Sequence, residues 1–188
     1  MPNANRIQTL YVVSGNPDTV NELPSSTTNV GTYPRTGQLG QAGDFNDRAY
    51  QYVQLDSGAT ASSSAGVVAA NEVAYWKDRS QYIVTNDSSQ ALFANTANSF
   101  RNNVAGIFRN AVTAGNYCYV LQRGRSISVK EAGSATPGMI LVSDTSATAA
   151  QALGTAIGTA PPVQPLGVVV TATAANVCTA DIDIPNIP

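Results

Sequence analysis

The sequence predicts an all-β protein: a compact β-barrel or sandwich preceded by an extended, irregular N-terminal arm. Val and Ile together number 28 of the 188 residues, whereas Leu numbers only 9, and β-branched residues favour strands. Only two residues are lysine, although the surfaces of helix bundles are rich in Glu and Lys. Several segments alternate apolar and polar residues between turn signals made of Gly, Pro, Asn and Asp, which is typical of strands in a sandwich or barrel.

Residues 1–45 are predicted to form the arm. Glycines and prolines interrupt this segment so often that no core-forming period survives, and only residues 7–13 are expected to pair as a strand. The arm nevertheless carries apolar, aromatic and basic side chains of types that bury well at interfaces. These candidate partner contacts are Tyr11, Val12, Val13, Tyr33 and Arg35. A disordered tail is the alternative interpretation.

Residues 46–188 are predicted to form the β-domain, with 104–184 as its clearest part. In its first half we expect strands at 49–55, 66–70, 73–77 and 81–85, and a small polar loop at 59–65. In the third of these strands, Val73 and Tyr75 share one face and Trp76 lies on the other. Residues 88–108 combine a helix-like apolar stripe with many Asn residues. They are therefore predicted to form a long loop, with at most one helical turn, that leads into a strand at Val104.

The second half of the β-domain has the most regular alternation. We expect strands at 117–122 and 126–130 joined by a tight hairpin loop at 123–125, then strands at 139–142 and 166–173 separated by a loop at 147–160. In the final strand, every second residue is predicted to point inward, namely Cys178, Ala180, Ile182 and Ile184. Asp181 and Asp183 point outward, where we expect a solvated sheet edge.

The composition argues against several classes of function. The chain has no His, which removes the commonest general base and the commonest metal ligand. No two Asp or Glu residues are marked as a catalytic pair, so we expect no enzymatic activity and no metal or small cofactor. A net charge of −2 without a basic run argues against nucleic-acid binding. The sequence has neither a signal-peptide pattern nor a long apolar stretch, so we expect a protein that is made in a cytoplasm and does not enter a membrane.

Several individual residues have two interpretations. Cys118 and Cys178 are predicted to be buried, reduced thiols, with a cross-strand disulfide as the alternative. Trp76 is expected in the core because of its large area, with an interface contact as the alternative. Arg123 and Arg125 flank the predicted hairpin tip, where they would either meet an acidic partner or lie in a solvated loop.

The segment from 104 to 124 resembles a bacteriophage pattern. An Ala-Gly pair within an apolar run at 104–108 is followed by Thr113, Gly115, an alternating Tyr segment and Gly124. This order is similar to the small β-barrel of phage capsid decoration, or cement, proteins, and the segments 138–141 and 165–168 resemble the second half of that barrel. The resemblance covers about residues 100 to 184.

The resemblance implies a structural virion protein on the capsid surface, in many cases a homotrimer, whose partner is the major capsid protein of the same virion. We therefore expect cementing, in which a β-domain sits outside the assembled shell and the arm ties neighbouring capsomers together. Weak contacts repeated by symmetry would suffice for such a role. A phage tail, collar or host-receptor module that binds a sugar or a protein is the alternative, and the chain looks short for a major shell subunit.

Overall fold

The structure is a computed structural model. It describes residues 42–45, 47–59, 66–92, 103–131, 133, 135–143, 152–155 and 165–184. These residues form an all-β fold, as predicted, and their one helical element is the short 3₁₀ turn Ser88–Gln90. In the part of the chain that is described, no helix has the length and apolar character needed to cross a membrane.

Five strands close into a ring. Their order is β2 (Arg48–Leu55), β5 (Ile83–Thr85), β4 (Val73–Asp78), β6 (Val104–Phe108) and β8 (Tyr117–Lys130), and β8 pairs back onto β2. Only the β2–β5 pairing is parallel among these. A two-stranded ribbon, β3 (Val67–Val68) with β7 (Val112–Thr113), lies beside the ring. All five ring strands contribute to one apolar cluster, which includes Leu55, Trp76, Val84, Phe108 and Val120.

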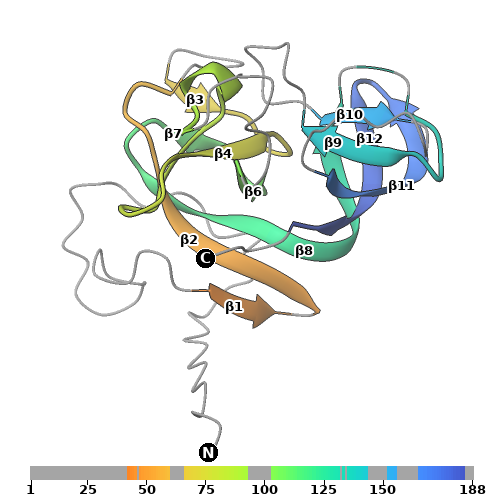
Figure 1. The fold of residues 1–188 in the computed structure, drawn as a ribbon, viewed down its shortest axis with the longest axis horizontal. Helices are drawn as coiled ribbons and strands as arrows, with labels where there is room; N and C mark the ends of the chain where they lie inside the picture. Colours follow the sequence, from red (N-terminus) through yellow and green to blue (C-terminus); the bar gives the residue numbers. More distant parts are fainter. Residues whose placement is uncertain are drawn as a thin grey trace, which may run out of the picture.

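The second half of β8 belongs to another lobe (Figure 1). There it pairs with β12 (Val177–Asp183), and the sheet continues through β11 (Pro165–Ala174) and β9 (Ile140–Ser143) to β10 (Ala152–Thr155). The inner face of this sheet and outward-facing ring residues share a second apolar cluster, with Ile127, Leu166 and Cys178 from the sheet and Tyr75 and Ile107 from the ring. The two lobes are therefore joined by a shared strand and a shared core.

The predicted hairpin at 123–125 is wrong, because β8 is one continuous strand of 14 residues. Its first half pairs with β2 and its second half with β12. On β12, Ala180 lies opposite Ile127 and Ile182 opposite Gly124, so β8 has one extra residue at this point. Ser126 takes a φ of 52°, and its N–H donates to Asp181 Oδ1 at 2.9 Å. The turn-like sequence thus forms a β-bulge that bends the strand, rather than a hairpin.

Besides β7, which pairs with β3, two longer strands lie where the sequence predicts none. β10 falls inside the predicted loop at 147–160 and pairs antiparallel with β9. β1 (Ala42–Phe45) falls in the predicted arm and pairs antiparallel with β2, which corrects the expectation that only 7–13 could pair there. Both are edge strands held by backbone hydrogen bonds, which need no apolar period in their own sequence.

The remaining strand predictions within the described residues are confirmed. In β4, Val73 and Tyr75 belong to the cluster shared by the lobes, while Trp76 belongs to the ring cluster. β12 alternates buried and exposed residues as expected. The 3₁₀ turn after Asp87 and the start of β6 at Val104 agree with the prediction for 88–108, of which residues 93–102 lie outside the described residues.

Candidate binding groove

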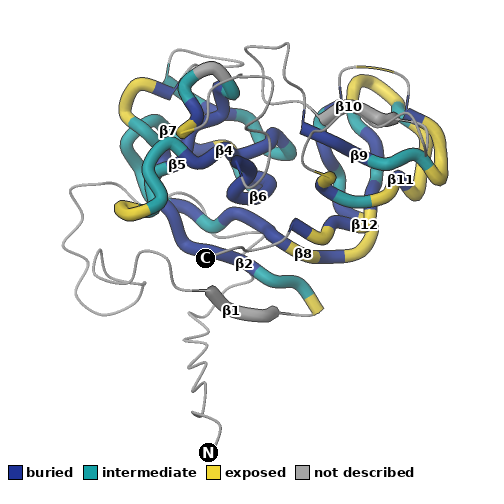
Figure 2. The backbone as a smooth tube through the Cα atoms, in the orientation of Figure 1, coloured by how far each residue is buried: buried dark blue, intermediate teal, exposed yellow. Residues whose placement is uncertain are grey.

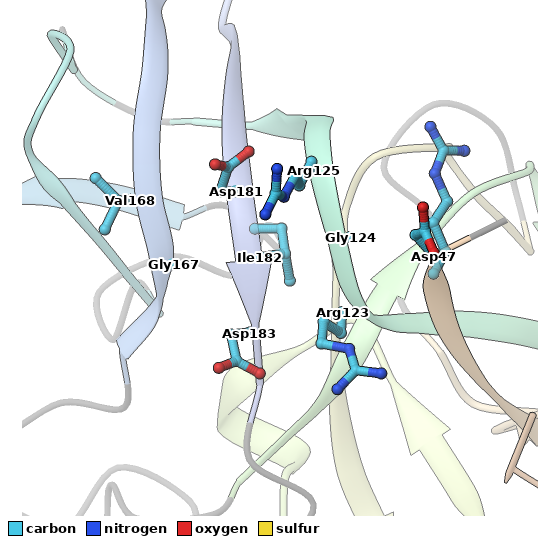
Figure 3. A pocket seen from close by; sticks show the side chains of 10 residues that line it. Asp47, Arg123, Gly124, Arg125, Gly167, Val168, Asp181, Ile182 and Asp183 are labelled. Atoms are coloured by element: carbon cyan, nitrogen blue, oxygen red, sulfur yellow. The ribbon is translucent and has the colours of Figure 1, made fainter. Parts of the chain in front are cut away.

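An open groove of about 900 Å³ lies along β8, β12 and β11 and beside the turn between β1 and β2 (Figure 3). Six of its ten lining residues are charged, three acidic and three basic. The charged set is Asp47, Arg48, Arg123, Arg125, Asp181 and Asp183. The charges of the groove are therefore balanced in sign, and Gly124, Gly167, Val168 and Ile182 complete its lining.

The two-residue period of strands produces the charge pattern of the groove. Arg123 and Arg125 lie on one face of β8, while Asp181 and Asp183 lie on the same outer face of β12. Asp183 is directly opposite Arg123 in the ladder. All four side chains belong to exposed residues, because the alternate positions of both strands face the apolar cluster. Two adjacent strands thus present a row of positive charge beside a row of negative charge.

The backbone beneath these rows is held on both sides. β12 pairs with β8 and with β11, and β8 pairs with β12 and β2 around the bulge. Asp181 also accepts the hydrogen bond of the Ser126 N–H, which ties the acidic row to the bent part of β8. The expectation of a solvated edge is therefore half correct: Asp181 and Asp183 are exposed, but β12 is an interior strand.

The structure separates the candidate contact residues that the sequence suggested. Arg123 and Arg125 both line the groove, whereas Trp76 is only 3 % exposed in the ring core. Its indole packs edge-on against the Tyr82 ring at 6.2 Å and lies 5.8 Å from the Arg79 guanidinium carbon. The interface alternative for Trp76 is therefore wrong. The five arm residues proposed as contacts, Tyr11, Val12, Val13, Tyr33 and Arg35, lie outside the described residues.

Sequence reasoning missed Asp47 and Arg48 as groove residues. They follow the short strand β1, and Asp47 has a φ of 61° in the turn to β2. The Asn-Asp pair at 46–47 is a recognisable turn signal. The ladder between β2 and β8, in which Ala49 lies opposite Arg123, is what brings this turn beside the two arginines.

Two glutamates outside the groove are fully buried, which the sequence did not indicate. Glu72 accepts hydrogen bonds from Lys130 Nζ at 2.8 Å and from Asn86 Nδ2 at 3.1 Å. Glu131 accepts from Thr173 Oγ1 at 2.6 Å and from the Gly133 N–H at 2.9 Å. These carboxylates are used in internal contacts around the end of β8. Among the described residues, no three His, Cys, Asp or Glu stand together as a possible metal site.

The two cysteines are free and buried, which confirms the prediction for them. Burial, and to a smaller extent the nearby charge of Glu131, raises the pKa of the Cys178 thiol to about 11. Cys178 is therefore protonated at neutral pH, and since the thiolate is the nucleophilic form, this residue is chemically inert there. The competing interpretation of a cross-strand disulfide is wrong.

Asp56 has the capping role that is common for Asp in a turn. Its Oδ2 accepts from the Gly58 N–H at 3.1 Å and pairs with Lys77 Nζ at 2.6 Å. The carboxylate is therefore engaged with its own turn and with β4.

No protein-family model matches the chain, and neither does any curated protein. Among solved structures, the chain is similar to the N base of the head fiber protein gp8.5 of bacteriophage phi29. The two share 12 % sequence identity with a TM-score of 0.43, and the match covers 75 % of this chain and 98 % of that chain.

Proposed function

We propose that this chain is a structural component of a bacteriophage virion that binds the outside of the assembled capsid. In this proposal the groove contacts the major capsid protein, and the N-terminal arm reaches neighbouring subunits. The proposal includes no catalytic step and no cofactor. The observation that carries it is the pair of opposite-charge rows on β8 and β12, together with the phage-like sequence pattern between 104 and 124.

The groove suits a protein partner better than a nucleic acid. A nucleic-acid surface needs an excess of positive charge to displace counterions, whereas this groove holds equal numbers of Arg and Asp. Ordered charges of both signs favour one partner orientation and reject others, which is how protein interfaces obtain specificity. Because paired strands hold the backbone beneath the charges, little backbone entropy is lost when a partner binds, and the entropy cost is confined to the exposed side chains. On a shell, many such contacts add up through multivalency.

Removal of the positive row is expected to weaken capsid binding. In the Arg123→Gln/Arg125→Gln variant, the acidic row remains without its complement, and a partner surface that fits both rows loses its charge match. We expect at least about tenfold weaker co-sedimentation with the particle, since loss of close charge pairs at interfaces costs on the order of 1.5 kcal/mol or more. Co-sedimentation with purified capsids that lack the protein measures this effect.

The matched control is Ser57→Glu/Gln81→Glu, which lowers the net charge by the same amount at exposed positions of the ring lobe. It should bind as the natural chain does. Equal binding by the arginine variant would contradict a role for the groove.

Electron micrographs of the decorated particle would also decide between functions, because density on the tail or collar instead of the capsid faces would favour the receptor-binding alternative.

The arm is proposed to act beside the groove. Residues 1–41 of the arm precede β1, an edge strand whose first residue, Ala42, lies opposite Gln51 of β2. At roughly 3.3–3.6 Å per residue, 41 residues span at most about 150 Å. Ordering such a segment costs about 1 kcal/mol or more per residue. Many contacts would be needed to offset that cost, and a closed lattice supplies them.

Deletion of residues 1–40 is therefore expected to leave a folded β-domain that binds the particle much more weakly. The truncated chain keeps β1 and both apolar clusters, so its thermal unfolding midpoint should stay close to that of the full chain. Thermal unfolding and particle co-sedimentation of the two chains measure both effects. Immediate unfolding would mean that the arm is part of the core. Undiminished binding would rule out the cementing mechanism.

A further inference from the structure

Two β-bulges lie close together in β8, one on each of its two edges. Along the edge that pairs with β2, β8 advances two residues, from Leu121 to Arg123, while β2 advances only one. Along the edge that pairs with β12, β8 advances three residues, from Gly124 to Ile127, while β12 advances two. Each irregularity inserts one extra residue into β8. Residues 123–125 therefore lie between two bulges.

The bulges decide which way the arginines of the groove point. Residues two apart share a face of a regular strand, so Arg123 and Arg125 would face the apolar cluster shared by the lobes, together with Ile127. In the structure both arginines are exposed, whereas Gly124 is buried and lies opposite Ile182 of that cluster. The tube of β8 in Figure 2 accordingly alternates between exposed and buried where the strand enters the second lobe. The positive row of the groove thus depends on the two bulges.

The bulge that faces β12 contains a residue in a strained conformation. Ser126 has a φ of 52°, in the left-handed region that few residues other than Gly, Asn and Asp adopt. In the bulge type that has a left-handed residue, this residue is usually glycine. The Ser126 N–H donates across the strands to Asp181 Oδ1 at 2.9 Å. A hydrogen bond to a carboxylate is of the size needed to offset the cost of the left-handed conformation.

We propose, on the basis of the proposed function of this groove, that Asp181 is a positioning residue for Arg125. The Asp181 carboxylate holds Ser126 in the left-handed conformation, and this conformation keeps the preceding residue, Arg125, on the outer face of β8. Contact with the partner on the acidic side then falls to Asp183, which lies opposite Arg123. The two members of the acidic row therefore differ in role, although they are chemically identical.

Hydrogen exchange of the Ser126 amide, followed by NMR without any particle, tests the hydrogen bond. Asp181→Ala should speed this exchange at least about tenfold, because it removes a hydrogen bond to a charged acceptor. Asp181→Asn keeps an oxygen acceptor and should speed the exchange by no more than about threefold. Asp78→Ala is the matched control, because Asp78 Oδ1 accepts from the Ser80 N–H at 2.9 Å in a turn of the ring lobe. It should leave the exchange of Ser126 unchanged.

Co-sedimentation with purified capsids that lack the protein tests the positioning of Arg125. Asp181→Ala should bind at least about tenfold more weakly, since only the fraction of molecules with Arg125 in place binds. Asp181→Asn should recover most of this loss. Addition of Ser126→Gly to Asp181→Ala should also recover part of it, because glycine adopts the left-handed conformation without strain. If Asp181 instead meets the partner through its charge, the Asn and Ala variants bind equally weakly and glycine recovers nothing.

Circular dichroism shows whether each variant is folded, and Asp181→Val, also without an acceptor, replaces Asp181→Ala if that variant is not. Unchanged exchange of Ser126 in the folded Ala or Val variant would overturn the inference, and so would equal binding losses in the Asn and Ala variants. If the natural chain itself fails to bind capsids, the proposed function fails. The exchange rates and a crystal structure of Asp181→Ala still test the inference in that case, because an unmoved Ser126 and Arg125 would overturn it.

Discussion

Replacement of Gly167 by alanine is expected to destabilise the protein severely, by about 3 kcal/mol or more, as overpacking against backbone does. A Cβ built on Gly167 would overlap the carbonyl oxygen of Asp181 on the adjacent strand. Neither strand can move away freely, because β11 pairs with β9 on its other side and β12 with β8. Urea denaturation followed by circular dichroism measures the change in the free energy of unfolding.

Gly124→Ala is the matched control, since Gly124 also lies in a strand that lines the groove. Its added Cβ would meet Ile127 Cδ1 at 3.0 Å and Arg48 Cγ at 3.1 Å, which are side-chain atoms that can rotate. We expect a loss of less than about 1.5 kcal/mol for this change. If the Gly167 variant unfolds at the same urea concentration as the natural chain, the close approach of β11 and β12 is wrong.

Lys130→Met should cost about 3–5 kcal/mol of stability, because removal of one partner of a buried ion pair leaves an uncompensated charge. The Glu72 side chain is 0 % exposed, whereas that of Lys130 is 26 % exposed, so the carboxylate is the buried member of the pair, and Lys130 Nζ lies 2.8 Å from its Oε1. Its remaining side-chain partner is the amide of Asn86, whose own Oδ1 is buried without a hydrogen-bond partner. Chemical denaturation at neutral pH measures the loss.

The chain contains its own control for this prediction. Its other lysine, Lys77, pairs with Asp56 at 2.6 Å, but that side chain is 38 % exposed and that of Asp56 is 13 % exposed. Lys77→Met should therefore lose only about 1 kcal/mol or less, as exposed ion pairs contribute little. Glu72→Gln combined with Lys130→Met should recover part of the stability lost by the single change. Equal losses for the two lysine variants would show that burial of Glu72 does not decide the cost.

Much of the local structure could be read directly from the sequence. The strict alternation of the last strand identified its buried residues, from Cys178 to Ile184, and the β4 pattern separated Trp76 from Tyr75. These predictions succeed because the two-residue period of a strand is set by its own backbone geometry and by which side chains avoid water. The all-β class and the buried free cysteines follow from the same local patterns.

Only the tertiary structure decided the features that depend on residues far apart in the chain, namely the course of β8, the groove and the ion pair of Glu72. Arg123-Gly124-Arg125 looks like a hairpin turn locally, but it continues as a strand because β2 and β12 pair with its two halves. Asp183 is 60 residues from Arg123 but lies opposite it in the ladder between β12 and β8, and Glu72 is 58 residues from Lys130 but pairs with it at 2.8 Å. The groove and the buried ion pair arise from strand pairing between distant segments. No local period in the sequence encodes such pairing. The closing of the ring and the packing of two sheets on a shared core select which distant strands pair.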